Sequence, residues 1–275
     1  MDRLRVTKER LEKDVASCGL HAGDTVLMHS GLKAIGFVEG GPDVVIDVLL
    51  AQLGPNGTLM VPAFTYSYAG RTATIPFDVK TTPGSRNGAI ADRVRERPET
   101  VRSAHPSHSF AAIGRNAHFL CDDHQLEHAV SEPSPLTRLI ALDGRIFFLG
   151  CGVESNVMLH LAEAMACFRY DHIPFSPQWG EEYLIASPDG PIRAHVSEHP
   201  GCDIRFPIVA DKLMMEGRGI RSSVGMAQTF LFNAKDILET GLQMLNENPD
   251  ILLCHQPHCE ACEPRRKYLK GIGAI

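Results

Sequence analysis

The sequence predicts an α/β fold, a three-layer sandwich in which helices cover both faces of a mainly parallel central sheet, plus a β-hairpin excursion. Short buried strands alternate with amphipathic helices, which is typical of this class. The composition, with 44% hydrophobic and 22% charged residues, is that of a globular protein. Because the 275 residues contain no internal repeat and no clear linker, we expect one domain over 1–275, with a cysteine-rich C-terminal tail at 251–275.

The expected elements follow in order along the chain. Thr7 can cap the first helix, a Gly-Pro pair begins the second, and Gly54 ends it. A loop rich in Pro, Gly, Thr and Tyr at 62–84 interrupts the alternation, and Ser187-Pro-Asp-Gly190 is typical of a hairpin turn. The expected helices are 8–18, 41–53, 89–96, 204–215 and 233–245, with a further helix beginning in 156–163. The expected strands are 24–28, 58–61, 145–150, 183–186 and 192–196.

Charge and cysteine content narrow the class of protein. A net charge of -6 argues against nucleic acid as the main partner and suits a cationic ligand, although the mildly acidic balance common among soluble proteins also explains it. The first twenty residues are charged and of helical pattern, unlike a signal peptide, and no apolar run approaches the roughly 20 residues of a membrane span. We therefore expect a cytoplasmic protein with no membrane partner. Its eight cysteines are then reduced, and a cysteine cluster indicates a metal rather than disulfides.

The stretch Asn156-Val-Met-Leu-His160-Leu-Ala-Glu163 carries the pair of residues best suited to chemistry. It follows a buried strand and begins a helix, on which residues three apart share a face, so His160 and Glu163 point the same way. Open α/β sheets place their ligands near the ends of such strands. An imidazole held by a carboxylate can move a proton near neutral pH, which favours an enzyme over a binding module.

Two other segments are rich in polar side chains. Residues 28–36 (Met-His-Ser-Gly-Leu-Lys-Ala-Ile-Gly) lie where a strand gives way to a loop, so small residues let backbone N–H groups approach a phosphate and Lys33 supplies charge. An ordinary strand-end loop has the same spacing. Residues 105–109 (His-Pro-Ser-His-Ser) hold two imidazoles and two hydroxyls, which indicates either a cleft lining or a surface turn made by Pro106.

Five segments, in order, resemble the aminoglycoside 3-N-acetyltransferase family, which uses acetyl-coenzyme A and has its own α/β fold, distinct from that of the GNAT-type acetyltransferases. They are Leu-Met-His-Ser-Gly-Leu-Lys-Ala-Ile-Gly at 27–36, Gly-Thr-Leu-Met-Val-Pro-Ala-Phe-Thr at 57–65, His-Pro-Ser-His-Ser-Phe at 105–110, Ser-Pro-Leu-Thr-Arg-Leu at 134–139, and 149–163 from Leu-Gly to Leu-His-Leu-Ala-Glu. The resemblance covers about residues 8–245, most of the chain.

The resemblance implies a catalytic pair and a donor site. It implies that His160 is the general base and Glu163 its support, and that the acetyl group passes directly to the acceptor in a ternary complex. This agrees with the chemistry, because an amine must lose a proton before its nitrogen attacks a thioester, and the oxyanion that forms must be stabilised. The coenzyme A site that the resemblance implies consists of His29, Ser30, Gly31, Leu32 and Lys33, with Ser107, Ser109 and Phe110 across from them.

The acceptor implied by the resemblance is an aminoglycoside, a polycation, so carboxylates are expected to line its cleft. The candidates are Glu163, Asp171, Glu181 and Glu182. The chain departs from the family at Val157, where the family usually has Thr or Ser three residues before its histidine, so a hydroxyl expected near the thioester is missing. Residues 168–176 also match the resistance enzymes poorly, which leaves another small-molecule amine open as the acceptor.

Two alternative functions come from other classes. Cys151 follows a strand between two glycines, somewhat as a nucleophile sits on a tight elbow. With His160 and Glu163 it would form a triad for thioester or amide hydrolysis, or for acyl transfer through a covalent intermediate. A small buried thiol is the plainer interpretation of Cys151. The other alternative is a non-catalytic coenzyme A or polyamine binder, which Val157 allows. A monomer and a homodimer are both open.

The C-terminal tail carries a metal-type motif. The spacing Cys254-x4-Cys259-x2-Cys262 gathers three soft ligands at nearly zinc-finger distance. Cys202 can supply a fourth ligand, or His255 or His258 can. Because four such ligands leave no coordination position open, we expect a structural zinc ion that pins the tail to the domain. Free thiols on a flexible tail are the alternative.

Overall fold

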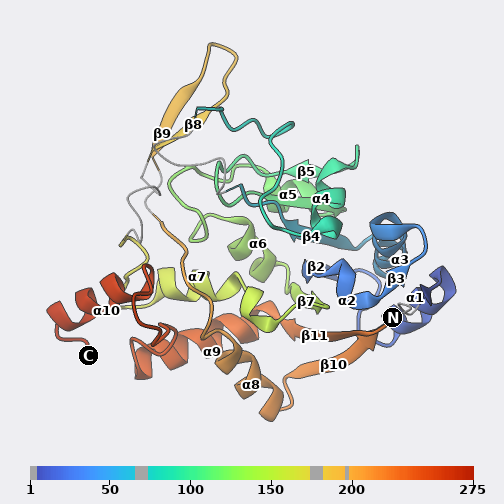
Figure 1. Cartoon of the computed structure of the whole chain (residues 1–275). Helices are drawn as coiled ribbons and strands as arrows, with labels where there is room; N and C mark the ends of the chain where they lie inside the picture. Colours follow the sequence, from blue (N-terminus) through green and yellow to red (C-terminus); the bar gives the residue numbers. More distant parts are fainter. Residues whose placement is uncertain (1–4, 66–73, 174–181, 196–197) are drawn as a thin grey trace.

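The computed structural model describes residues 5–65, 74–173, 182–195 and 198–275. At its centre lies a seven-stranded sheet in the order β10-β11-β7-β2-β4-β6-β5 (Figure 1). The strands of this sheet are β2 (Thr25–Ser30), β4 (Thr58–Pro62), β5 (Val101–Arg102), β6 (Phe110–Gly114), β7 (Arg145–Leu149), β10 (Gly219–Val224) and β11 (Ala227–Asn233). Two short pairs lie outside it, β1 (Arg5–Val6) with β3 (Phe37–Val38) and β8 (Glu182–Ile185) with β9 (Ile192–His195).

The sheet is mixed, although the predicted α/β class is confirmed. The central strands β4, β2 and β7 are parallel neighbours. The other neighbours pair antiparallel, because β6 and β11 run opposite to the rest of the sheet. Most strands therefore run in one direction, as expected for a mainly parallel sheet. The pairs outside the centre are nevertheless antiparallel, which was not expected. Short connections, such as the turn at Gly225 between β10 and β11, can only join antiparallel strands.

Helices cover both faces of the sheet, as a three-layer sandwich requires. Successive strand residues point to opposite faces, so Leu27 enters one core while Val26 and Met28 enter the other. The core of Val26 is closed by α1 (Lys8–Ala16), α3 (Gly41–Leu53) and α4 (Ala89–Glu96). The core of Leu27 is closed by α5 (Ala117–Cys121), α6 (Pro135–Ala141), α7 (Met158–Met165), α8 (Pro207–Met215) and α9 (Ala234–Glu247). No helix in the described ranges is both long and apolar enough to cross a membrane.

The predicted helices and strands occur within a few residues of their expected bounds. The predicted hairpin is confirmed as β8 and β9, whose turn is closed by a 3.0 Å bond from Gly190 N–H to the Ser187 carbonyl. It projects from the top of the molecule in Figure 1. The expected loop at 62–84 is only partly described, because 66–73 lie outside the described residues. The organisation of 1–275 as one domain stays a prediction.

Residues 251–275, the C-terminal unit, are packed against the rest of the chain and do not form an extended tail. The helix α10 (Cys262–Gly271) contributes Leu269 to a third apolar cluster, which also contains Leu253 and Tyr170. Tyr170 comes from the segment after α7, so this unit is attached close to the region where the sequence predicts the catalytic pair.

Candidate active site

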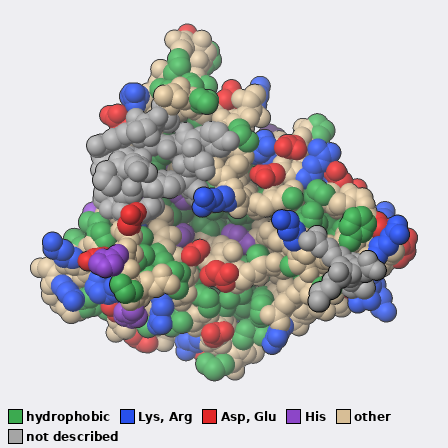
Figure 2. Space-filling model, in the orientation of Figure 1, with side chains coloured by type: hydrophobic (Ala, Val, Ile, Leu, Met, Phe, Trp, Pro, Cys, Tyr) green, Lys and Arg blue, Asp and Glu red, His purple; other side chains and the backbone are tan. Residues whose placement is uncertain are grey.

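A cavity of about 520 Å³ opens at the carboxyl edge of β2, β4 and β7. His29 and Ser30 reach it from β2, and His108 reaches it from the residues before β6, which begins at the same edge. The first residues of α7 and the segment 200–206 line another part. Figure 2 shows a hollow in the middle of the molecule, with histidine side chains inside it and acidic side chains along its lower rim. This is where an open α/β sheet places its ligands.

His160 and Glu163 lie together at this cavity, one turn apart on α7. His160 Nδ1 is 2.7 Å from Glu163 Oε2, and the carboxylate is only 2% exposed. When Nδ1–H donates to the carboxylate, Nε2 keeps a lone pair and is the nitrogen left to take a proton. Because His160 lines the cavity, the pair has the geometry of a general base with an orienting carboxylate.

Two aromatic residues that the sequence analysis missed complete the support of this pair. The Tyr170 hydroxyl donates to Glu163 Oε1 at 3.0 Å. Burial raises the pKa of Tyr170 well above its ordinary value, and the nearby Glu163 carboxylate adds to this effect. The hydroxyl therefore keeps its proton and remains a donor. The Phe206 ring packs edge-on against the His160 ring, with centroids 4.8 Å apart. Neither residue belongs to a recognisable motif.

His29 and Ser30, both predicted for coenzyme A, lie in the cavity wall. Burial lowers the pKa of His29 to about 3, so the imidazole is neutral at physiological pH, and its ring stacks on Phe148 at 5.4 Å. Among the described residues, His29 Nε2 and Ser30 Oγ have no hydrogen-bond partner. Buried polar atoms of this kind are normally satisfied, so their position beside a cavity suits a polar ligand.

The neighbouring Gly31 has a structural role, and Leu32 and Lys33 are not among the residues lining the cavity. Gly31 N–H donates to the Leu149 carbonyl at 2.8 Å, and a Cβ at Gly31 would lie 2.4 Å from the Gly150 carbonyl oxygen. Glycine is therefore required where β2 and β7 end side by side. Lys33 is exposed on the short helix α2 (Leu32–Ile35). The cationic side chain among the residues that line the cavity is Arg86, which lies between the predicted loop and the predicted helix 89–96 and has no motif to mark it.

Ser107, Ser109 and Phe110 do not line the cavity. Ser107 Oγ is 2.8 Å from His108 Nδ1, Ser109 Oγ donates to the Ala63 carbonyl at 2.6 Å, and Phe110 is fully buried in the core. His108 lines the cavity between them, and burial lowers the pKa of its imidazole well below the ordinary value. Of the predicted segment 105–110, His108 is thus the residue that lines the cavity.

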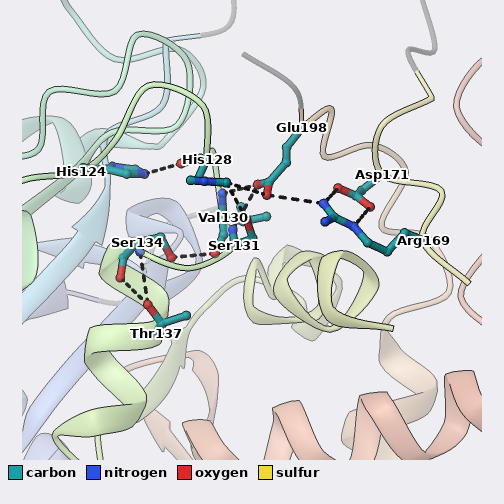
Figure 3. A network of polar contacts seen from close by, with 9 residues as sticks. All are labelled: His124, His128, Val130, Ser131, Ser134, Thr137, Arg169, Asp171 and Glu198. Atoms are coloured by element: carbon teal, nitrogen blue, oxygen red, sulfur yellow. Dashed lines mark hydrogen bonds and ion pairs between the residues drawn. The ribbon is translucent and has the colours of Figure 1, made fainter. Parts of the chain in front are cut away.

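The described carboxylates predicted for the acceptor are not among the residues that line the cavity. Glu163 lies behind His160, and Glu182 is exposed on the hairpin. Asp171 is buried, and the Arg169 guanidinium donates to both of its oxygens at 3.1 and 2.8 Å (Figure 3). Glu181 lies outside the described residues. The binding of an acceptor by these residues stays a prediction, and of the described ones none is among the residues lining the cavity.

Two other carboxylates, Glu154 and Asp203, line the cavity and were missed. Glu154 belongs to the 3₁₀ turn η2 (Val153–Ser155), and Asp203 to the wall that also contains Phe206. Burial raises the pKa of Asp203 above its ordinary value, and the nearby His160 opposes that shift. The sequence marks them only by their position, since each follows closely after a cysteine that the sequence analysis singles out, Cys151 or Cys202. Together they make this part of the cavity suited to a cation.

Val157 and Cys151 also line the cavity. Val157 is 4% exposed and comes immediately before α7, so an apolar side chain occupies the place where the family usually has a hydroxyl. Burial raises the pKa of the Cys151 thiol to about 11, and no hydrogen bond joins its sulfur to His160 in the described part of the chain. Because the thiolate is the reactive form, this environment gives the triad hypothesis no support.

The four predicted metal ligands are brought together. The sulfur atoms of Cys202, Cys254, Cys259 and Cys262 all lie within 4.8 Å of one another. The Cys254 N–H donates to Cys262 Sγ at 3.3 Å. Tetrahedral Zn²⁺ with bonds of about 2.3 Å places its sulfurs about 3.8 Å apart, so the cluster needs only a small contraction. The alternative ligands His255 and His258 are exposed and do not belong to this group.

Comparisons with known proteins identify the family of the chain. A family model described as aminoglycoside 3-N-acetyltransferase matches residues 27–246. Aminoglycoside N(3)-acetyltransferase VII of Streptomyces paromomycinus is 34% identical over 266 residues, covering 88% of this chain and 92% of that protein. Aminoglycoside N(3)-acetyltransferase III of Pseudomonas aeruginosa is 31% identical over 245 residues, covering 82% of this chain and 89% of that protein.

Solved structures of similar enzymes share the fold over nearly the whole chain. A mutant of aminoglycoside acetyltransferase AAC(3)-IVa in complex with a gentamicin superposes with a TM-score of 0.84 at 30% identity, covering 98% of this chain and 99% of that one. AAC-IIIb bound to CoASH superposes with a TM-score of 0.79 at 27% identity, covering 89% of this chain and 97% of that one.

Proposed function

Because the chain belongs to the aminoglycoside 3-N-acetyltransferase family, we propose that it transfers the acetyl group of acetyl-coenzyme A to an amino group of an aminoglycoside-like polycation. The observation that carries this proposal is the 2.7 Å contact between His160 Nδ1 and buried Glu163 at the cavity wall. Similar structures contain CoASH and a gentamicin, which supports the classes of donor and acceptor. Acetylation removes a positive charge from the acceptor, and we propose antibiotic resistance as the role.

The reaction follows from the orientation of the base. His160 Nε2 takes a proton from the acceptor ammonium, and the Glu163 carboxylate stabilises the imidazolium that forms. The neutral nitrogen then attacks the thioester carbonyl carbon, and the carbonyl electron pair moves to oxygen. When this intermediate collapses, the C–S bond breaks and the second proton of the nitrogen passes to the sulfur. The products are the amide and free coenzyme A thiol, and His160 returns its proton to solvent.

The donor side of the cavity is assigned to the end of β2. Ser30 Oγ and His29 Nε2 offer polar atoms without partners among the described residues, and Arg86 offers positive charge to the phosphate groups. Lys33 is exposed next to this edge and can meet a phosphate outside the cavity. The neutral His29 ring can share a hydrogen bond without adding charge beside the thioester.

The acceptor side is assigned to Glu154 and Asp203. Carboxylates at a partly buried wall attract a polycation more strongly than surface carboxylates do, because water screens them less. Val157 leaves an apolar contact beside the base, where a hydroxyl would otherwise meet the ligand.

The tetracysteine cluster is proposed to hold one structural zinc ion. Four sulfurs within 4.8 Å of one another, joined from two distant segments, form a closed ligand set. Reduced thiols fit a cytoplasmic location, which belongs to the same proposal. Elemental analysis of untagged protein is expected to give one zinc per chain, and a content far below one removes the zinc from the proposal.

A thiol-release assay tests the function. Wild-type protein with acetyl-coenzyme A is offered a panel of aminoglycosides and other amines, and acetylation of at least one aminoglycoside is expected. His160→Gln should lose activity by orders of magnitude and still bind acetyl-coenzyme A in calorimetry, because the groups assigned to the donor are His29, Ser30 and Arg86. Near-normal turnover of His160→Gln would refute the base. Activity on other amines alone would replace the acceptor and leave the mechanism in place.

A further inference from the structure

The tetracysteine cluster lies directly behind one wall of the cavity. Cys202 stands between Gly201 and Asp203, and both neighbours line the cavity. The other three cysteines belong to the C-terminal unit. An ion bound by all four sulfurs therefore ties the wall to the C-terminal unit at a single point.

The same wall rests on α10 without intervening space. A Cβ at Gly201 would lie 2.7 Å from Arg265 Nη1 and 3.1 Å from the Ala261 side chain. The Arg265 guanidinium also donates to the carbonyl of His199. The backbone of 199–201 is thus held against one turn of α10 by a close contact and a hydrogen bond.

Arg265 reaches the catalytic pair as well. It is 1% exposed, and its guanidinium lies 5.6 Å from the centre of the Tyr170 ring. Tyr170 donates to Glu163, and Glu163 contacts His160 Nδ1. A continuous series of contacts therefore runs from α10 to the proposed base.

The charge of Arg265 requires an explanation that the cluster provides. Within the described ranges Arg265 makes no ion pair, and its Nε has no partner. A buried charge is costly unless it is compensated. Four thiolates and one Zn²⁺ carry a net charge of about −2. Arg265 lies one turn after Cys262 on α10, and its guanidinium approaches Gly201, the residue before Cys202, so we infer that the charge of the cluster compensates that of Arg265.

We propose that the tetracysteine zinc site is a positioning element of the active site. Through Arg265 and Tyr170 it fixes the carboxylate that orients His160, and through Cys202 it fixes the wall that carries Asp203. The proposal rests on the proposed function and on the proposed zinc. Its consequence is that the C-terminal unit sets the rate of acetyl transfer while leaving the donor site on β2 unchanged.

Two variants interrupt the series of contacts at different points. Tyr170→Phe removes the hydroxyl and keeps the ring, and Arg265→Met removes the charge and keeps most of the volume. Each is expected to lower kcat by about 10- to 100-fold, because supporting residues of this kind hold a reacting group in line. The Kd for acetyl-coenzyme A should stay within about twofold. Arg265→Lys, which restores the charge, should recover part of kcat.

Proton NMR adds a readout that activity alone does not give. The Nδ1 proton of His160 bonded to Glu163 should resonate far downfield, and its absence in His160→Gln assigns it. The signal should weaken or shift in Tyr170→Phe, in Arg265→Met and in Cys202→Ser, which should also lose zinc. Cys167→Ser is the matched control, because Cys167 is exposed and outside the cluster. Should Cys202→Ser fail to fold, the Tyr170 and Arg265 variants still decide.

The possible outcomes distinguish a failure of this proposal from a failure of the proposed acetyltransferase function. Wild-type kcat and an unchanged resonance in both Tyr170→Phe and Arg265→Met overturn the positioning role, and so does a wild-type protein without zinc. If the wild type acetylates no amine, the proposed function fails on its own, and the resonance then tests the series of contacts alone.

Discussion

Replacing Glu163 by Gln tests the catalytic pair at the carboxylate, both oxygens of which are hydrogen-bonded. The carboxylate is buried, with His160 at one oxygen and Tyr170 at the other. An amide has one acceptor oxygen and one donor group, so it cannot accept from both neighbours. If its NH₂ group faces His160, Nδ1 must accept and the ring proton moves to Nε2, which then no longer serves as a base.

The magnitude follows from the contact that is lost. A hydrogen bond to a charged group contributes about 1.5–3 kcal/mol, and about 1.4 kcal/mol corresponds to a factor of ten in rate. Loss of the stabilised imidazolium therefore lowers kcat by about 10- to 150-fold. Any population of the wrong tautomer lowers it further, so we expect a loss of about 100-fold or more.

Steady-state thiol release with saturating acetyl-coenzyme A measures this loss. The KM for the donor should change little, because Glu163 is bound by His160 and Tyr170 and is not among the residues that line the cavity. Glu239→Gln is the matched control, since Glu239 is an exposed partner of Lys235 on α9 and should leave kcat unchanged. A kcat of Glu163→Gln within about threefold of wild type, with the fold intact, would refute the role of the carboxylate.

Four further predictions concern single cavity residues. Cys151→Ala should keep kcat within about threefold, because a thiol whose pKa is raised to about 11 is not the nucleophile; loss of nearly all activity would restore the covalent mechanism. Val157→Thr should raise kcat if the family hydroxyl assists at the thioester, and an unchanged or lower kcat contradicts that assistance. Asp203→Asn should raise the KM of a polycationic acceptor several-fold at low salt; in wild type this KM should rise as pH falls through the raised pKa of Asp203, and a flat profile argues against acceptor binding there. Burial lowers the pKa of His29 to about 3 in the folded state, so as pH falls the unfolded chain binds this proton first. The free energy of unfolding should therefore be unaffected by His29 above about pH 6.5 and should decline towards pH 3 by up to about 1.4 kcal/mol per pH unit. Urea titrations of wild type and His29→Gln should resolve this difference.

Local signals in the sequence were sufficient for most of the fold. The helix α3 lies exactly where its Gly-Pro start and Gly54 stop place it, because both signals act within one turn. The pair β10 and β11 was missed because its exposed strand alternates polar residues with few apolar ones, as in Gly219–Val224. Its antiparallel pairing with β7 is a long-range choice, so no local pattern identifies the mixed sheet.

For the candidate site, too, local patterns predicted some residues, and the positions of others depend on long-range folding. His160 and Glu163 are three residues apart on one helix, so their contact follows from helical spacing alone. The four cysteines were found by ligand type. Glu154, Asp203 and Tyr170 could not be found, because their position depends on how loops between elements return to the cavity. Asp171 shows the converse, since a carboxylate close to the site in sequence is already bound by Arg169.

The family core and the C-terminal unit make separable contributions to the active site. The family match covers residues 27–246, which include the base, its carboxylate and Tyr170. Arg265 and three of the clustered cysteines lie beyond it. A buried carboxylate that orients a base needs donors on both oxygens, and here one of those donors, Tyr170, is itself contacted by a guanidinium from outside the residues that the family model matches. It follows that changes in the C-terminal unit should alter the rate of this enzyme through residues that never touch either substrate.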